Sequence, residues 1–324
     1  MMSESGLLTA FILDGRGGAL PQGWEDLADW TPRAGPLWVH LNRESRDTRE
    51  WLENSSGIDP MVVEALLAES TRPRCVSMND GVMLFLRGVN LNPGADPEDM
   101  VSIRLWIEPQ RIVSVRLRRL LSVDDLRKEL LDGKGPVDVG HFVVRLADHM
   151  VSRMVDVMSD IDDAVDRLQG EVLESGSSGL RTELTHLRHE IITLRRYLAP
   201  QRDALARLAQ LKLAWLREDE LLQLREEIDR VTRYVEDLDA ARERASVTQE
   251  ELSNLLSEQL NSRMYVLSVV AAIFLPLGFL TGLFGINVGG IPLAENPWGF
   301  WEVSGLLVLI ALVQLAVFRW RRWF

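Results

Sequence analysis

Apolar residues fill the last fifth of the chain in two runs that a short loop separates. The runs extend from Met264 to Phe284 and from Trp298 to Phe318, and neither contains Asp, Lys, Arg or His in its interior. Each is close to the ~20 residues that a helix needs to cross the hydrocarbon core of a bilayer. We therefore predict membrane spans at 264–284 and 298–318 with an external loop at 285–297. A buried helix pair is the weaker alternative, because the runs are long and uniformly apolar.

Basic residues flank the two runs on one side only. Arg263 precedes the first run, and three arginines follow the second in a tail at 319–324, whereas the loop has no basic residue. The positive-inside rule then predicts a multi-pass protein of a bacterial-type inner membrane with both ends in the cytoplasm. The N-terminus lacks a basic segment followed by a long apolar one, so we expect no cleaved signal.

The first part of the chain mixes strand-like and helical patterns. A helix is expected over 59–70, and Ser122 is expected to cap the start of another. Two strand-like runs, 101–107 and 111–117, are predicted to form a hairpin that turns at Pro109 and Gln110. Strands are predicted at 7–13, 37–41, 82–89, 101–107 and 111–117. Residues 1–135 are therefore predicted to form a cytoplasmic α/β domain.

From residue 136 onward the pattern is helical. A hairpin is predicted at 136–216: one long helix to about residue 174, a break at the Ser-Gly run 175–179, and a second helix over 180–213 that is kinked at Pro200. A stalk helix follows at 217–263. No Pro or Gly interrupts 217–275, so the stalk is expected to continue into the first span. The stalk carries a heptad row of Leu221, Leu224, Ile228, Val231, Val235 and Leu238. Such a row needs a partner helix, either from another copy or from the hairpin folding back. The fold class is an α+β membrane protein.

A second row follows the same 3.5-residue step through the junction with the membrane. It is polar before the membrane, bulky at entry and small near the far side. The members of this row, the stripe, are Glu250, Asn254 or Ser253, Ser257, Asn261, Met264, Leu267, Ala271, Leu275, Gly278, Gly282 and Gly285. Several copies with the stripe inward would form a pore that narrows at Met264 and Leu267 and opens at Asn287. The alternatives are a solvated face and close helix packing at the glycines.

Pro276 lies inside the first apolar run. It leaves the carbonyl one turn earlier, near Ala272, without its helical donor. In a membrane such a carbonyl must face protein or water. Pro276 therefore favours a pore or a packed interior over a helix that lipid surrounds.

The run from Met264 to Asn287, with Pro276 inside it and Gly285-Ile286-Asn287 at its end, resembles the first transmembrane helix and Gly-Met-Asn-type signature of the CorA superfamily of divalent-cation transporters. The order of elements along the chain is also similar. The resemblance implies a homopentameric funnel in which the ion enters past Asn287. The family positions that line the pore match Glu250, Ser257, Asn261, Met264 and Leu267.

Three residues depart from the Tyr-Gly-Met-Asn-Phe pattern of the magnesium-type members. They are Phe284, Ile286 and Val288, and the continuation Gly-Gly-Ile-Pro at 289–292 is similar to the ZntB branch, which is associated with zinc. The resemblance implies Zn2+ uptake, with protons as a coupling ion. A magnesium, cobalt or nickel channel is the alternative within the class. A membrane-tethered coiled-coil scaffold without transport is the alternative from another class.

The first span contains no thiolate, imidazole or carboxylate. Tight zinc sites use such ligands, so we expect the ion to pass largely hydrated, meeting the Asn287 amide and the Gly285 carbonyl. Glu295 in the external loop is expected to attract cations.

Two histidines in the hairpin, His186 and His189, have the i, i+3 spacing that can hold one metal, with Glu183 and Glu190 nearby. The acidic runs 160–166 and 218–220 are further candidates for cation sites. A solvated helix face is the commoner explanation of all three patterns.

The net charge of −12 is carried entirely by the part before the spans, because residues 261–324 hold four arginines against Glu295 and Glu302. This excess argues against nucleic acid as a partner and fits a protein that gathers cations. Cys75 is the only cysteine and is expected to be a buried apolar residue. The chain has no Gly-rich phosphate loop, HExxH motif or triad, so we expect neither an enzyme nor a cofactor.

Overall fold

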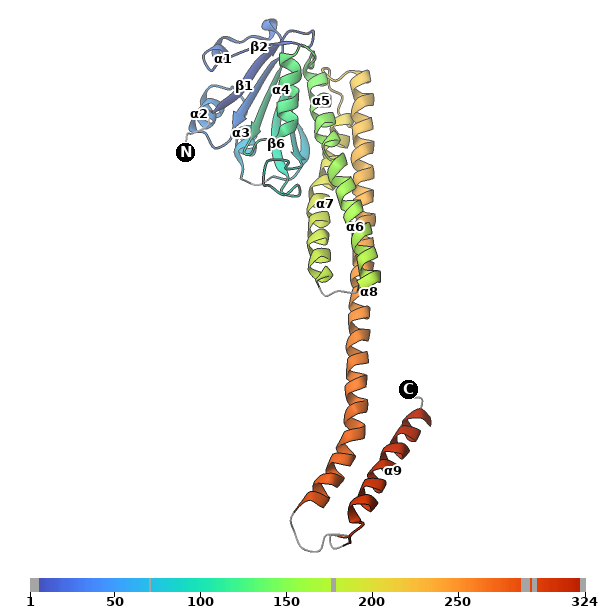
Figure 1. Cartoon of the computed structure of the whole chain (residues 1–324). Coiled ribbons are helices and arrows are strands. Elements are labelled where there is room, and N and C mark those ends of the chain that lie inside the picture. Colours follow the sequence, from blue (N-terminus) through green and yellow to red (C-terminus); the bar gives the residue numbers. More distant parts are fainter. Residues whose placement is uncertain (1–5, 70, 176–178, 287–291, 293–295, 321–324) are drawn as a thin grey trace. The chain divides into compact units, whose positions relative to one another are not determined.

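The chain divides into two compact units, Met1–Glu250 and Glu251–Phe324. The computed structural model describes residues 6–69, 71–175, 179–286, 292 and 296–320. Figure 1 colours its elements along the sequence. The bulk of the regular structure lies in the first unit, where a sheet and several helices surround two apolar cores.

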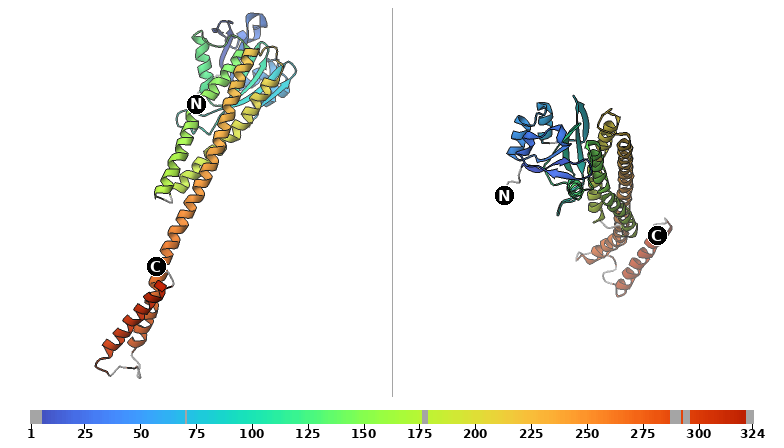
Figure 2. Two further views of the ribbon diagram at one scale, coloured as in Figure 1. Left: turned by 90° about the vertical axis from the view of Figure 1, so that its right-hand side faces the viewer. Right: turned by 90° about the horizontal axis from the view of Figure 1, so that it is seen from above.

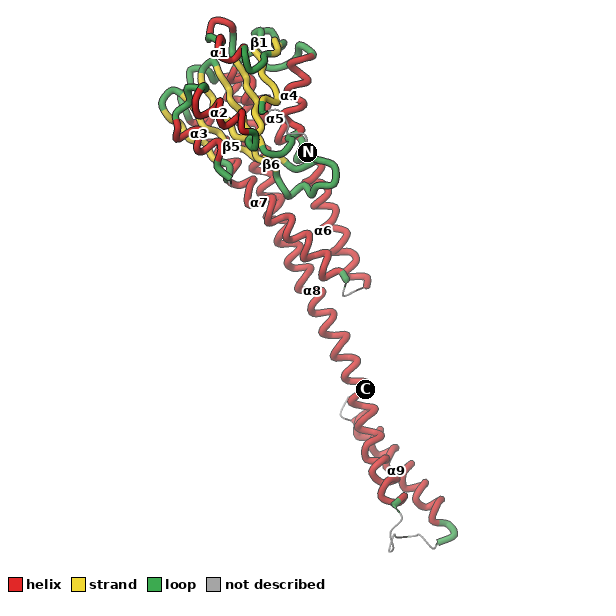
Figure 3. Tube along the Cα trace, turned by 90° about the vertical axis from the view of Figure 1, so that its left-hand side faces the viewer, coloured by secondary structure: helices red, strands yellow, loops and turns green. Residues whose placement is uncertain are grey.

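A seven-stranded sheet forms the centre of the first unit, and its strands are drawn yellow in Figure 3. The strands are β1 (Leu7–Leu13), β2 (Ala19–Pro21), β3 (Leu37–Asn42), β4 (Arg74–Met78), β5 (Gly81–Gly88), β6 (Val101–Glu108) and β7 (Arg111–Arg116). Their order is β2-β1-β3-β7-β6-β5-β4. Strands β3 and β7 pair in parallel, and the other neighbouring pairs are antiparallel. The β6–β7 hairpin turns where Pro109 and Gln110 predicted it.

Helices cover both faces of the sheet, which explains why β3 and β5 read as continuous apolar runs. On one face, α1 (Asp26–Asp29), the 3-10 turn Pro32–Ala34, α2 (Arg46–Asn54) and α3 (Pro60–Leu67) surround a core that contains Val39, Leu41 and Phe85. On the other face, α4 (Leu121–Leu131) and α5 (Val139–Ser152) pack over Trp38, Leu84 and Leu105. The result is a three-layer α/β domain.

Two further helices, α6 (Val155–Ser175) and α7 (Leu180–Gln210), form the predicted hairpin and run side by side in the views of Figures 1 and 2. The long helix α8 (Glu218–Gly285) follows, and it passes without a break from the stalk into the first apolar run. Leu224 and Val231 of the heptad row join the core that also holds Leu205 and Leu208 of α7. Helices of the same chain therefore supply the partner that this row requires.

Several local predictions were wrong. Strands β2 and β4 and helices α1 and α2 were not predicted, because they are short or lack a clear period. Ser122 is not an N-cap: α4 begins at Leu121, and the Ser122 hydroxyl donates instead to the His149 carbonyl at 3.3 Å. The long helix expected before the Ser-Gly run is two helices, α5 and α6. The kink at Pro200 stays a prediction, since Pro200 lies inside α7 and the helix continues past it.

The second unit contains the end of α8 and a separate helix, α9 (Gly299–Trp320). Both α8 and α9 are long and apolar enough to cross a membrane. Their large apolar side chains are mostly exposed, unlike those of a buried helix pair in a soluble protein. This exposure agrees with the spanning prediction.

Candidate functional site

The apolar end of α8 has one face toward α9. Val269 is 7% exposed, and Ile273, Leu277, Leu280 and Phe284 are half-buried. At about 100° per residue, these five positions form one row along the helix. We call this row the α9-facing row.

The stripe lies on the opposite side of α8. By the same helical geometry its membrane members point away from the α9-facing row. Met264, Leu267 and Leu275 are all more than 60% exposed. A Cβ added at Gly278, Gly282 or Gly285 would meet nothing within 4 Å. Ala271 is half-buried, and the other members of the stripe in the apolar run are exposed. No other part of the described chain therefore covers this face of α8.

The polar members of the stripe are exposed as well. Ser257 and Asn261 lie on α8 before the apolar run, and the Ser257 hydroxyl donates to the Ser253 carbonyl at 2.8 Å. Glu250, at the end of the first unit, is also exposed. Asn287 and Glu295 lie outside the described residues. Gly285 is the last residue of α8, and Ile286 follows it with an exposed side chain.

A residue that the sequence reasoning missed is Gln314 of α9. Its Nε2 lies 3.5 Å from the carbonyl oxygen of Ala272, the carbonyl that Pro276 leaves without a helical donor. This interaction agrees with the expectation that the freed carbonyl faces protein. The signal was present in the sequence, since Gln314 is a polar amide in the middle of the second apolar run.

The histidines of the hairpin are both exposed on α7. Glu183 accepts hydrogen bonds from Arg167, so this carboxylate is already engaged. Burial, together with the charges of Glu98, Asp160 and Asp96, raises the pKa of Glu190 to about 7. Within the described residues no group of three His, Cys, Asp or Glu is placed to hold a metal ion. A site at His186 and His189 therefore stays a prediction.

Two arginines of the same chain pair with part of the acidic runs. Arg244 pairs with Asp162 and with Asp166. In the second run, Glu220 is buried and pairs with Arg217 at 2.8 Å. These carboxylates stabilise the helices around α8, which weakens the case for open cation sites there.

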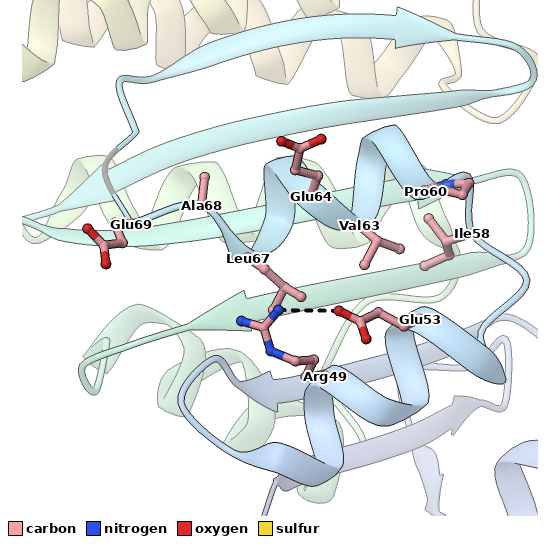
Figure 4. Close-up of a pocket in the computed structure, with 9 residues that line it drawn as sticks. All are labelled: Arg49, Glu53, Ile58, Pro60, Val63, Glu64, Leu67, Ala68 and Glu69. Atoms are coloured by element: carbon pink, nitrogen blue, oxygen red, sulfur yellow. Dashed lines mark hydrogen bonds and ion pairs between the residues drawn. The ribbon is translucent and has the colours of Figure 1, made fainter.

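A hollow of about 480 Å³ lies between α2 and α3 in the first unit (Figure 4). Ile58, Val63 and Leu67 give it an apolar floor, and an ion pair of 3.2 Å joins Arg49 and Glu53 beside it. No stripe residue lines it. The hollow is therefore separate from the candidate path along α8.

An α/β domain, a long helix with an apolar end and a second apolar helix together define a membrane protein with two candidate spans and a large domain before them. Residues 33–322 match the family described as CorA-like Mg2+ transporter protein. Because the match covers most of the chain, the protein belongs to this family, whose members are ion transporters and not enzymes.

Relatives from bacteria match almost the whole chain. The divalent cation transporter CmaX of Pseudomonas aeruginosa is 42% identical over 325 residues, covering 99% of this chain and 97% of the relative. The zinc transport protein ZntB of Pectobacterium carotovorum is 36% identical over 309 residues, covering 95% of this chain and 93% of the relative.

Solved structures confirm the predicted fold class. The structure of full-length CmaX matches with a TM-score of 0.86 at 41% identity and covers 99% of both chains. The CorA magnesium transporter of Methanocaldococcus jannaschii matches with a TM-score of 0.80 over 96% of this chain and 98% of that chain. Its identity of 18% shows a shared fold and no more.

Proposed function

We propose that this protein carries zinc ions across the inner membrane through a homopentamer in which the stripe of each copy faces a common axis. The observation that carries the proposal is the uncovered stripe opposite the α9-facing row. Because α9 covers the other side of α8, the stripe is free to contact further copies of the chain. A ring of such faces would enclose a path with polar, apolar and small-residue sections.

The path can be followed from the cytoplasmic side. Ser257 and Asn261 would line a polar entrance, and Met264 and Leu267 a narrow apolar constriction. The small residues beyond them leave room for a hydrated ion. We place the outer mouth at Asn287, whose amide oxygens would meet the ion together with the carbonyls of Gly285 and Ile286. Glu295 would raise the local cation concentration outside.

Zinc is favoured by two observations. Relatives named ZntB match 95% of the chain, and the sequence departs from the magnesium-type signature at Phe284, Ile286 and Val288. The family description names magnesium, and the relative CmaX is called a divalent cation transporter. Magnesium, cobalt or nickel is therefore the competing cargo.

The proposed direction is uptake, with protons moving together with zinc. Both chain ends and residues 1–135, 136–216 and 217–263 would stay in the cytoplasm, as the distribution of basic residues around the two spans favours. The acidic balance of this part would hold arriving cations near the inner end of the path.

Proteoliposomes containing the full chain test this proposal. We expect faster uptake of Zn2+ than of Mg2+, and faster zinc uptake when a pH gradient drives protons in the same direction. Asn287→Leu should reduce the flux, while Thr281→Val, a substitution on α8 outside the stripe, should not. Faster Mg2+ uptake would overturn the choice of zinc. An intact oligomer without any flux would instead favour the coiled-coil scaffold.

A further inference from the structure

Arg104 of β6 is a buried cation whose partners are backbone carbonyls. Its side chain is 3% exposed, and it donates to the carbonyl oxygens of Leu66 at 2.5 Å and Glu69 at 3.4 Å. These carbonyls lie near the C-terminal end of α3, where the helix dipole favours a cation. Within the described residues no carboxylate lies within 4 Å of its guanidinium. A buried charge normally has a full opposite charge beside it.

Three other arginines lie close enough to Arg104 to act on its charge. Burial and, after it, the charges of Arg43, Arg87 and Arg74 lower the pKa of Arg104 to about 10. The guanidinium is still protonated at neutral pH. Positive charge thus accumulates where β5 and β6 meet the segment after α3.

A pocket of about 230 Å³ opens onto this cluster. Arg87 and Arg104 form part of its wall, and Arg118 and Arg196 lie at its exposed rim. The guanidiniums of Arg87 and Arg196 lie 4.1 and 4.8 Å from the ring centre of Tyr197, which holds them in place. Three carboxylates, those of Glu69, Glu98 and Asp99, also line the pocket.

Many of the arginine donors have no partner among the residues that the structure describes. Each guanidinium has five N–H groups. Arg87 directs hydrogen bonds to Thr71 and Met100, and Arg104 to two carbonyls. The rim residue Arg196 donates to the Tyr197 hydroxyl at 3.1 Å. With four arginines against three carboxylates, the lining of the pocket keeps a net charge of +1 and offers guanidinium N–H groups without a partner among the described residues.

We propose that this pocket binds a phosphoryl group, either as inorganic phosphate or as the end of a nucleotide. Arginines of β5, β6, α7 and the segment after β7 line this one pocket, and their unused N–H groups suit the acceptor oxygens of a tetrahedral dianion. The small volume suits a single such group and no polymer. The bound anion gives Arg104 the counter-charge that its buried position lacks. This inference goes beyond ion transport and does not depend on which ion is carried.

Calorimetric titration of the full chain in detergent micelles with inorganic phosphate, at fixed ionic strength, tests the proposal. We expect saturable binding that Arg196→Gln or Arg118→Gln weakens about tenfold, the loss typical of a charged hydrogen bond. Both substituted residues are exposed, so the fold should persist. The matched control is Arg202→Gln, which removes an α7 arginine that pairs with Asp203 outside the pocket. Arg202→Gln should bind phosphate as the parent chain does.

Titrations with AMP and with adenosine distinguish the two sources. Tighter binding of AMP than of phosphate, with no binding of adenosine, identifies a nucleotide. Equal binding of AMP and phosphate identifies the phosphoryl group alone. Three results overturn the proposal: no saturable phosphate binding, equal weakening by Arg196→Gln and Arg202→Gln, or adenosine binding as tight as that of AMP.

Discussion

Gln314 Nε2 lies 3.5 Å from the carbonyl oxygen of Ala272 and so joins α9 to α8 at the carbonyl that Pro276 leaves without a donor. The contact is within the second unit. It shows how a proline is accommodated in a membrane helix, since a neighbouring helix supplies the missing N–H. The burial of Val269 and of the rest of the α9-facing row shows which side of α8 faces α9, and therefore which side remains uncovered.

Removing the Gln314 donor should weaken the second unit only while Pro276 is present. Gln314→Leu is expected to cost about 0.5–1.5 kcal/mol, the range of hydrogen bonds between membrane helices. In a Pro276→Ala background the helix regains its own donor to Ala272, so Gln314→Leu should have little effect. Thermal unfolding in detergent of the parent chain, the two single variants and the double variant measures the coupling between Gln314 and Pro276. Equal losses in both backgrounds would show that Gln314 acts independently of the proline.

Gly140 of α5 allows the starts of α5 and α8 to approach closely. A Cβ at this position would collide with the Glu220 carboxylate and with the Trp215 carbonyl. Gly140→Ala is therefore expected to destabilise the first unit by about 1–3 kcal/mol. Gly170→Ala in α6 is the control, because its Cβ would meet nothing within 4 Å, and it should be neutral or stabilising. Similar unfolding temperatures for the two variants would refute the close approach.

His40 should make the first unit sensitive to acid. Burial, with a smaller contribution from Arg116, lowers the pKa of His40 to about 3, and its Nδ1 lies 2.8 Å from the Ser114 hydroxyl. The unfolded chain takes up a proton near pH 6.5, but the folded chain does not. Stability is therefore lost as the pH falls from 6.5 toward 3, by about 2 kcal/mol between pH 6.5 and 5.

The variant His40→Gln removes this titration. Its free energy of unfolding should vary less between pH 6.5 and 5 than that of the parent chain, whatever its value at pH 7. A slope as steep as that of the parent would mean that other groups cause the acid sensitivity.

Cys75 should be inert in the folded protein. It is buried in the core beside β5, and burial raises the pKa of its thiol to about 11, despite the nearby Arg207. Since the thiolate is the reactive species, alkylating reagents at pH 7.5 should label Cys75 only after denaturation. Mass spectrometry of folded and unfolded samples measures the labelling. Rapid labelling of the folded chain would contradict this burial.

The strands with clear periods and the long helix could be predicted from the sequence. Five strands and the β6–β7 turn follow from apolar runs bounded by turn residues, and α8 follows from the absence of Pro and Gly over 217–275. Strand β2 has three residues, too few to show a period. Ser122 illustrates another limit, because it stands near a helix start and yet its hydroxyl donates to the His149 carbonyl.

The stripe could be traced from spacing, but its exposure could not. A 3.5-residue row looks the same whether it packs on a neighbouring helix or stays free. The heptad row shows the first outcome, since Leu224 and Val231 are buried by the same chain. The arginine cluster around Arg104 was invisible in the sequence, because β5, β6 and α7 bring it together from distant positions.

The conduction path along the stripe is tested most directly by the accessibility of two adjacent α8 positions to a thiol reagent, one in the stripe and one outside it. Leu267 belongs to the stripe, whereas Val266 lies about 100° further around α8, on the side of the α9-facing row, and both are exposed in this chain. In proteoliposomes, a charged, water-soluble thiol reagent should block zinc flux through Leu267→Cys and leave Val266→Cys unaffected, with Cys75 too buried to contribute. Block of Val266→Cys alone, or of neither variant while both carry zinc, would contradict a conduction path along the stripe.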